Sequence, residues 1–182
     1  LASSSPTYDP VKDFQMVGTI SQNPTCIIVN PNLPVNNTRD LVALFKANPG
    51  KYAYGSAGPG TITNLTGELF KLLGGKLDVQ HVPYKGGGPA LQDLIAGHIP
   101  LITTIMSSAV LAQHRAGKVK ILSVNSENRL KVAPDIPTTV EAGVAEMRVQ
   151  VFNAIFAPGN TPKEVLDYLK TVHAKVHAMM QP

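Results

Sequence analysis

The sequence contains little cysteine, few aromatic residues and little charge, and each shortage excludes a class of protein or site. Cys26 is the only cysteine among 182 residues, so neither an internal disulfide nor a cysteine-rich metal cage can form. Charged residues make up 15% of the chain and the net charge is +4. The Lys and Arg residues form no cluster interleaved with aromatics, which argues against nucleic-acid binding. No apolar run approaches the roughly 18–20 residues that a membrane-spanning helix needs.

Apolar, β-branched runs alternate with amphipathic segments of helical length, and this alternation predicts an α/β fold with a largely parallel sheet. Cys26 lies in one such run, "TCIIVN", which predicts a buried structural thiol rather than a nucleophile. The expected strands cover about 15–21, 26–30, 51–55, 79–82, 101–104, 120–125 and 149–156. Two Pro-rich crossings, "SQNPTCIIVNPNLP" and "FAPGNTP", stand at either end of the central block and mark the expected domain boundaries.

Helices are expected between these strands, where capping residues and glycines mark their ends. Thr38 is the expected N-cap of the first helix, and the second runs from about Thr61 to Leu73. The third has Pro89 in its first turn, and the fourth is capped by Ser107 or Ser108. The segment "PDIPTTVEAGV" predicts a turn and a short helix, and "TPKEVLDYLKTVHAKVHAM" predicts the last helix.

The loop "GSAGPGT" joins an expected strand to a helix N-terminus, where unpaired N–H groups and the positive end of the helix dipole favour an anion. Glycine lets the backbone approach a ligand closely, and hydroxyl groups add donors. The loop lacks the Lys-Ser/Thr pair of a P-loop and the third glycine of a dinucleotide fingerprint. No cofactor is therefore expected. The loop alone fits an anion cradle and an ordinary turn equally well.

A second glycine-rich loop favours the cradle. In "HVPYKGGGPALQDLIAG", three consecutive glycines lead from an expected strand into a helix. Loops that follow neighbouring parallel strands lie at the same edge of the sheet, which is where ligands bind in open α/β folds. We therefore expect the two loops to contribute to one site for a carboxylate or phosphate.

Four stretches of the chain resemble the Bug family, the periplasmic solute receptors of tripartite tricarboxylate transporters. They are "PGKYAYGSAGPGTITNLTGELFKLLGG", "VQHVPYKGGGPALQDLIAGHI", "AGKVKILSVNSENRLKVAPDIPTTVEAG" and "FAPGNTPKEVLDYL". The resemblance runs in order from about Phe14 to the C-terminus, and the combination of "VPYKG..PAL" with "PD.PT..EAG" is specific to this family.

The resemblance implies a type II periplasmic binding protein with a three-layer α/β/α lobe, a mostly parallel sheet and part of a second lobe. It implies a second, central ligand-binding lobe at 24–147, with hinge crossings and the rest of the first lobe at 1–23 and 148–182. It also implies a periplasmic, monomeric protein that closes on a small carboxylate and delivers it to a membrane permease. The ligand-binding positions that it implies are Ser56, Ala57, Gly58, Gly60, Thr61, Thr63, Lys85, Gly86, Gly87 and Gly88.

Two features depart from the family pattern. Family members often have Phe-Asp where this sequence has Thr103 and Thr104, so a hydroxyl replaces an acceptor carboxylate. Both threonines are therefore added to the expected site, and the change argues against an amino-acid ligand and for a plain carboxylate. The family's N-terminal segment, with its own ligand-contacting loop, has no counterpart here. A fragment of a receptor is therefore expected, and such a fragment exposes half of a binding cleft.

The alternative function is an α/β enzyme that uses the same loops as an anion cradle for a phosphorylated or carboxylated substrate. The sequence offers no nucleophile elbow and no evident base for Ser56, so the binding protein is favoured over the enzyme. His173 and His177 stand four residues apart in the last helix, but a solvated helix face explains them better than a metal site. His81 points either at the cleft or into the core, and Tyr54 and Tyr84 either border the cleft or pack in the core.

Overall fold

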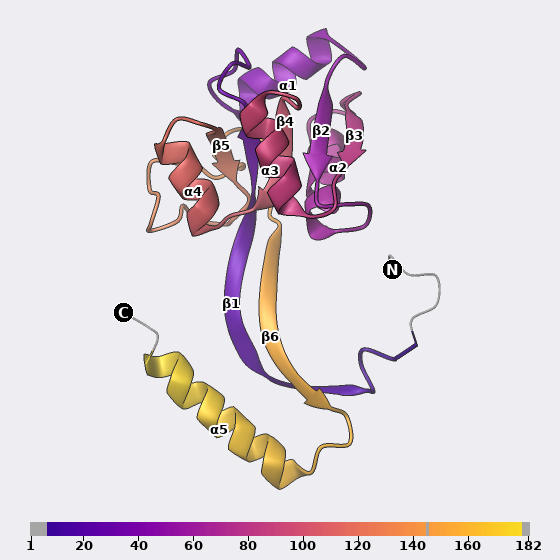
Figure 1. The fold of residues 1–182 in the computed structure, drawn as a ribbon, viewed down its shortest axis with the longest axis vertical. Coiled ribbons are helices and arrows are strands. Elements are labelled where there is room, and N and C mark those ends of the chain that lie inside the picture. Colours follow the sequence, from indigo (N-terminus) through magenta and orange to yellow (C-terminus); the bar gives the residue numbers. More distant parts are fainter. Residues whose placement is uncertain (1–6, 145, 180–182) are drawn as a thin grey trace. The chain divides into compact units, whose positions relative to one another are not determined.

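The computed structural model describes residues 7–144 and 146–179. The chain divides into two compact units. The larger unit contains Asn23–Val151, and the smaller unit contains the residues up to Gln22 and those from Phe152 onward. The chain passes between the units twice, along strands β1 (Phe14–Val29) and β6 (Gln150–Pro158), which pair with each other (Figure 1).

The larger unit is built on a sheet in the order β3-β2-β4-β1-β5. Strand β2 (Ala53–Ser56) runs parallel to both β3 (Gln80–Pro83) and β4 (Leu101–Ile105). Strand β1 is antiparallel to β4 and to β5 (Lys120–Val124). Four strands therefore share one direction and only β1 opposes them, which confirms the mixed α/β fold with a mostly parallel sheet.

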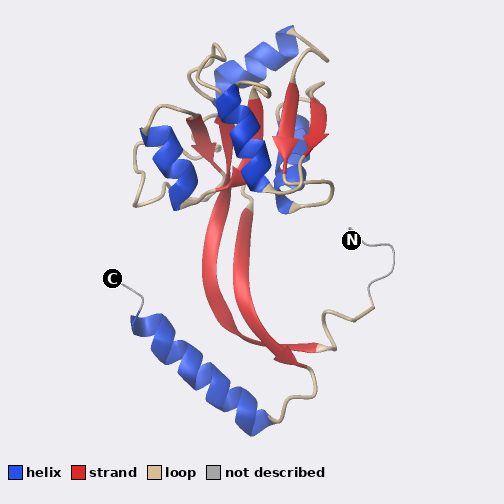
Figure 2. Ribbon diagram, in the orientation of Figure 1, coloured by secondary structure: helices blue, strands red, loops and turns tan. Residues whose placement is uncertain are grey.

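Helices cover both faces of this sheet because successive residues of a strand point to opposite sides. Ile27 belongs to a core cluster with helices α1 (Thr38–Ala47) and α2 (Ile62–Leu73). Ile28 belongs to a second cluster with α3 (Gly87–Ala96) and α4 (Ser108–Arg115). Both isoleucines are fully buried. The result is the expected three-layer α/β/α arrangement, and Figure 2 shows the helices around the sheet.

Three local expectations need correction. The first two expected strands form one strand of 16 residues, because Pro24 fits an extended backbone and its carbonyl accepts the Met106 N–H at 2.9 Å. The N-cap of α1 is Asn37, whose Oδ1 accepts the Asp40 N–H, while Thr38 is buried and donates its hydroxyl to Ser123. The expected short helix within 134–144 consists of turns.

Cys26 lies on β1 where this strand is paired with both β4 and β5, and its side chain is fully inaccessible. Burial raises the pKa of its thiol to about 12, so the reactive thiolate is scarce at neutral pH. We expect the native chain to resist alkylation by iodoacetamide at pH 8, and the same chain in denaturant to incorporate one label. Mass spectrometry of the two samples measures this, and rapid labelling of the native chain would contradict the buried position.

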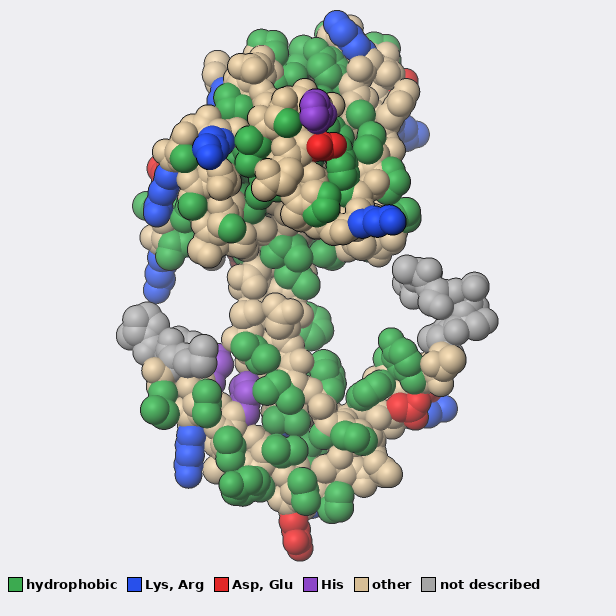
Figure 3. All heavy atoms as spheres, in the orientation of Figure 1, with side chains coloured by type: hydrophobic (Ala, Val, Ile, Leu, Met, Phe, Trp, Pro, Cys, Tyr) green, Lys and Arg blue, Asp and Glu red, His purple; other side chains and the backbone are tan. Residues whose placement is uncertain are grey.

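The smaller unit consists of the first half of β1, most of β6, and helix α5 (Lys163–Met179). Among the described residues of this unit, the buried core cluster consists of Val17, Ala157 and Leu166. Many large apolar side chains of this unit are exposed instead, and Figure 3 shows them as green patches over β1, β6 and α5. Within the described residues, no helix combines the length and apolarity that a membrane span requires.

Candidate functional site

Three helices begin at the same edge of the sheet in the larger unit. Strands β2, β3 and β4 are parallel, and the register aligns Ser56 at the end of β2 with Pro83 at the end of β3. Helices α2, α3 and α4 follow these three strands in turn, so their N-termini are brought to one edge (Figure 1). The structure thus confirms that the two glycine-rich loops follow neighbouring parallel strands, and it adds a third helix N-terminus.

A pocket of about 340 Å³ lies among these helix N-termini. It is formed by the loops after β2, β3 and β4 together with the first turns of the helices that follow them. The residues that line it are Ala57, Thr63, Gly87, Gly88, Leu91, Thr104, Ile105, Ser107, Ala109 and Val110. None of these side chains is ionisable, so recognition in this pocket depends on backbone amides, hydroxyls and apolar contact.

The first loop is closed by its own hydrogen bonds. The Thr61 side chain caps α2 by accepting the Asn64 N–H, and its hydroxyl donates to the Gly58 carbonyl at 2.7 Å. Thr63 Oγ1 accepts the Ala57 N–H at 3.0 Å. These bonds already use the Ala57 amide and the Thr61 side chain. The free donors of this loop are therefore the amides at the very start of α2 rather than those of the glycines.

The second glycine-rich loop leaves the N-terminus of α3 without a side-chain cap. Helix α3 has no side-chain cap, because its N-cap is Gly86, which has φ +112 and no side chain. The amides of Gly87 and Gly88 have no intrahelical partner at this position, and they donate to no other described residue. Both residues line the pocket. The positive end of α3 is therefore available to an anion.

The loop after β4 contributes the third helix N-terminus. Ser107 caps α4 by accepting the Val110 N–H at 3.3 Å, and Ser107, Ala109 and Val110 all line the pocket. The sequence indicates Ser107 as a helix cap, but nothing in it shows that β4 lies beside β2. Sequence reasoning therefore missed this wall of the pocket.

The adjacent threonines of β4 have separate roles because they point to opposite faces of the sheet. Thr103 is 2% exposed, and its hydroxyl donates to the Thr63 carbonyl at 2.7 Å. Thr104 is 8% exposed and lines the pocket, yet its hydroxyl has no hydrogen-bond partner among the described residues. Its Oγ1 lies 3.5 Å from the position that a Cβ on Gly87 would occupy. Thr104 thus presents a hydroxyl to the pocket that has no partner among the described residues.

The pocket gathers five of the twelve residues expected from the sequence: Ala57, Thr63, Gly87, Gly88 and Thr104. The others support it or lie outside its lining. Ser56, Gly58 and Thr103 are buried, and their polar groups bond to other parts of the chain. Gly60 and Lys85 are exposed, Thr61 is the cap of α2, and Gly86 is the cap residue of α3.

The two tyrosines that precede the glycine-rich loops are not pocket residues. Tyr54 is 1% exposed and its hydroxyl donates to Glu68 at 2.6 Å. Burial, with the Glu68 carboxylate second, raises its pKa well above the ordinary value. Tyr84 packs beside the α3–α4 core and donates to Asp93 at 2.9 Å. Both therefore belong to the core.

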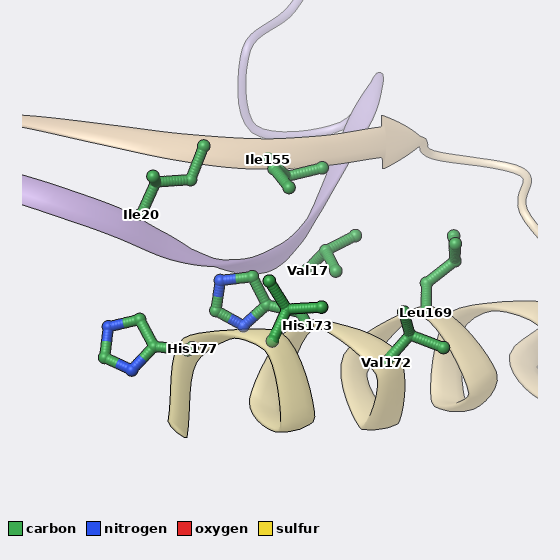
Figure 4. Close-up of a pocket in the computed structure, with 8 residues that line it drawn as sticks. Val17, Ile20, Ile155, Leu169, Val172, His173 and His177 are labelled. Carbon is green, nitrogen blue, oxygen red and sulfur yellow. The ribbon is translucent and has the colours of Figure 1, made fainter. Parts of the chain in front are cut away.

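A second pocket, of about 310 Å³, lies within the smaller unit between the β1–β6 pair and α5. Figure 4 shows Val17, Ile155 and Val172 pointing into it, with His173 and His177 at one end. The two imidazoles are stacked with centroids 5.8 Å apart, and His173 Nε2 lies 3.1 Å from the Thr19 carbonyl. No group of three or more His, Cys, Asp or Glu side chains suited to a metal ion occurs among the residues that the structure describes. The lining is almost wholly apolar, so it offers little to orient a polar ligand.

The sequence is similar to those of known proteins. Residues 4–182 match the family model described as tripartite tricarboxylate transporter family receptor, TctC. A curated relative, the UPF0065 protein in the TAR-I ttuE-ttuC' intergenic region of Agrobacterium vitis, is 36% identical over 163 residues. That match covers 89% of this chain and 46% of the relative, so the chain spans about half the length of the curated relatives it matches.

Solved structures agree with this match. A structure described as a periplasmic transporter superposes with a TM-score of 0.86 at 36% identity, over 98% of this chain and 58% of that one. An R. palustris protein solved with adipate has a TM-score of 0.85 at 32% identity, with 94% and 56% covered. MatC of Rhodopseudomonas palustris with bound malate has a TM-score of 0.81 at 29% identity, with 96% and 58% covered. Because the family model matches almost the whole chain, this protein belongs to the receptors of the tripartite tricarboxylate transporter family.

Proposed function

We propose that this chain is part of an extracytoplasmic solute-binding protein that captures a small carboxylate in the pocket at the N-termini of α2, α3 and α4. The ligand residues are Ala57, Thr63, Gly87, Gly88 and Thr104, which the sequence indicates, together with Ser107 and Ala109. The remaining residues expected from the sequence shape this pocket or border it.

One observation carries the proposal: the uncapped N-terminus of α3 opens beside an unpartnered hydroxyl. Gly87 and Gly88 present free amides, and Thr104 presents to the pocket a hydroxyl without a partner in the described chain. Donors that face a pocket and have no protein partner are available to a ligand or to ordered water. A carboxylate accepts from both kinds of donor at once, which satisfies them together.

The strength of these contacts is sufficient for a receptor. Each hydrogen bond to a charged acceptor contributes roughly 1.5–3 kcal/mol, so three or four support binding near the micromolar range after the entropy of association is subtracted. Leu91, Ile105 and Val110 add an apolar wall. That wall suits the carbon chain of an organic acid better than it suits inorganic phosphate.

The same lining favours binding without turnover. None of the residues around the pocket has an ionisable side chain, so no general acid or base faces a ligand there. Ser56, whose Oγ lies 2.8 Å from His81 Nε2, is fully buried and does not line the pocket. The enzyme alternative needs a reactive group in contact with the substrate, and this pocket offers no candidate for that role.

The proposal also includes delivery of the bound carboxylate to a membrane permease. We place the ligand-binding lobe at residues 24–147 and propose a periplasmic, monomeric receptor that hands its carboxylate to the membrane permease of a tripartite tricarboxylate transporter. Family membership supports the transporter, and the similar structures solved with adipate and with malate support the ligand class.

Calorimetric titration of the 182-residue chain tests the ligand class. Adipate, malate and citrate represent carboxylates, phosphate represents an inorganic anion, and 1,4-diaminobutane is a cation of similar length to the dicarboxylates. We expect saturable binding of at least one carboxylate, weaker binding of phosphate and none of the diamine. Recovery of the unchanged ligand by chromatography is expected from a receptor. Conversion of the ligand, or preference for the diamine, would contradict the proposal.

A further inference from the structure

A hydrogen-bonded serine–histidine pair, of which the serine is buried, lies next to the first glycine-rich loop. Ser56 ends β2, is 0% exposed, and places its Oγ 2.8 Å from His81 Nε2. His81 is aligned with Tyr54 across the β2–β3 pair, and the two rings are stacked with centroids 4.9 Å apart. The imidazole is therefore held in place by β2 and β3 together.

Ser56 also controls the loop that follows it. Its Oγ accepts the Gly58 N–H at 3.2 Å, and Gly58 has φ +130, a conformation that residues with a side chain rarely adopt. A hydroxyl has a single proton but two lone pairs. The single proton of Ser56 Oγ has two acceptors within reach, His81 Nε2 at 2.8 Å and the Gly58 carbonyl at 3.3 Å. When the shorter bond is made and the proton is donated to His81, both lone pairs of Oγ stay available and one accepts the Gly58 N–H. The histidine thereby orients the hydroxyl for its bond to the loop.

The bonds continue from this turn to the pocket wall. The Gly58 carbonyl accepts the Thr61 hydroxyl, and Thr61 Oγ1 lies 3.0 Å from Thr63 Oγ1. Thr63 accepts the Ala57 N–H, and both residues line the pocket. His81 is thus connected by consecutive hydrogen bonds to a wall that it does not itself form.

The groups around His81 favour the neutral imidazole that this arrangement requires. Burial is the largest influence on the pKa of His81 and lowers it. The Glu68 carboxylate of α2 raises this pKa, and the Lys71 ammonium of the same helix lowers it, so the pKa is below its ordinary value. The Tyr54 ring covers the imidazole from β2. A neutral imidazole with its proton on Nδ1 can accept at Nε2, which is the atom that faces Ser56.

We propose that His81 is a positioning residue for the ligand pocket: by accepting the Ser56 proton, it fixes the turn at Gly58 and so sets the placement of Ala57 and Thr63. This inference rests on the proposed function, because it concerns the control of the same site. It differs from a purely structural role for His81, in which the ring only fills space against Tyr54.

Three variants separate the two roles. His81→Phe retains an aromatic ring against Tyr54 but removes the acceptor, whereas His81→Gln supplies an amide oxygen near the position of Nε2. Ser56→Ala removes the hydroxyl itself. We expect His81→Phe and Ser56→Ala each to weaken adipate binding by about fivefold or more, and His81→Gln to stay within about twofold of the unmodified chain. Because His81→Phe and Ser56→Ala both remove the hydrogen bond between Ser56 and His81, the variant that combines them should bind adipate no more weakly than either single variant.

A readout that needs no ligand accompanies these titrations. Hydrogen exchange of the Gly58 amide is expected to accelerate in His81→Phe and Ser56→Ala, and to stay slow in His81→Gln. Unchanged exchange and affinity in His81→Phe, or a Gln variant as impaired as the Phe variant, would overturn the inference. If no carboxylate binds the unmodified chain, the proposed function fails, whereas the exchange rates still test the role of His81.

Discussion

Thr104→Val is expected to weaken carboxylate binding by about tenfold or more while leaving the free energy of unfolding unchanged or slightly higher. Valine has nearly the shape of threonine but lacks the hydroxyl. That hydroxyl belongs to a residue that lines the pocket, and it has no described partner, so its removal breaks no internal hydrogen bond. Calorimetric titration with adipate and urea denaturation of the same preparation measure the two quantities.

The neighbouring position provides a matched control. Thr103→Val removes a hydroxyl that donates to the Thr63 carbonyl at 2.7 Å, and the loss of this buried hydrogen bond costs about 0.5–1.5 kcal/mol of stability. Its side chain lies on the other face of β4, so the affinity of the folded chain should change little. Two adjacent variants with opposite effects are expected. Equal loss of affinity in both, or a destabilised Thr104→Val, would contradict the assignment.

Gly87→Val is expected to lower the affinity by tenfold or more, which corresponds to about 1.4 kcal/mol, with little effect on folding. Gly87 has no left-handed backbone, and a Cβ added there meets only Thr104 Oγ1, at 3.5 Å. The backbone therefore accepts a side chain. The two methyl groups of valine, however, occupy the space beside the free amides of α3 and displace a ligand from them.

Two further valine substitutions in the larger unit serve as a control and as a contrast for Gly87→Val. Ala47→Val places valine at an exposed position at the end of α1 and should change neither property. Gly58→Val is expected to lower both affinity and stability, since Gly58 has φ +130 and its added Cβ would lie 3.2 Å from the Tyr84 carbonyl. Normal adipate binding by Gly87→Val would mean that the ligand lies elsewhere.

The sequence predicts the architecture of the site better than its donors. Two strand–glycine–helix segments within an α/β pattern are sufficient to place Gly87 and Ala57 at one sheet edge, because parallel neighbouring strands end together. Strand periodicity could also have separated Thr103 from Thr104, since adjacent residues cannot both face one pocket. The sequence gives no sign of which loop amides are free, because that depends on internal bonds such as the one from Ala57 to Thr63.

Other parts of the site depend on contacts between distant segments. Ser107 is recognisable as a helix cap, but its place in the pocket follows from the order of the sheet, in which β4 lies between β2 and β1. The Ser56–His81 bond joins residues 25 positions apart. The continuity of β1 through Pro24 depends on the bond from Met106 to the Pro24 carbonyl. Local propensity contains none of this information.

The most direct test of the central claim is an amide chemical-shift map of the 182-residue chain titrated with adipate, because NMR detects weak as well as tight binding. The account predicts saturable shifts that are largest at the first turns of α2, α3 and α4, at Thr63, Gly87, Gly88, Ser108 and Ala109. Shifts concentrated in the apolar pocket of the smaller unit, around Val17, Ile155 and Val172, or no saturable shift at any amide, would contradict it.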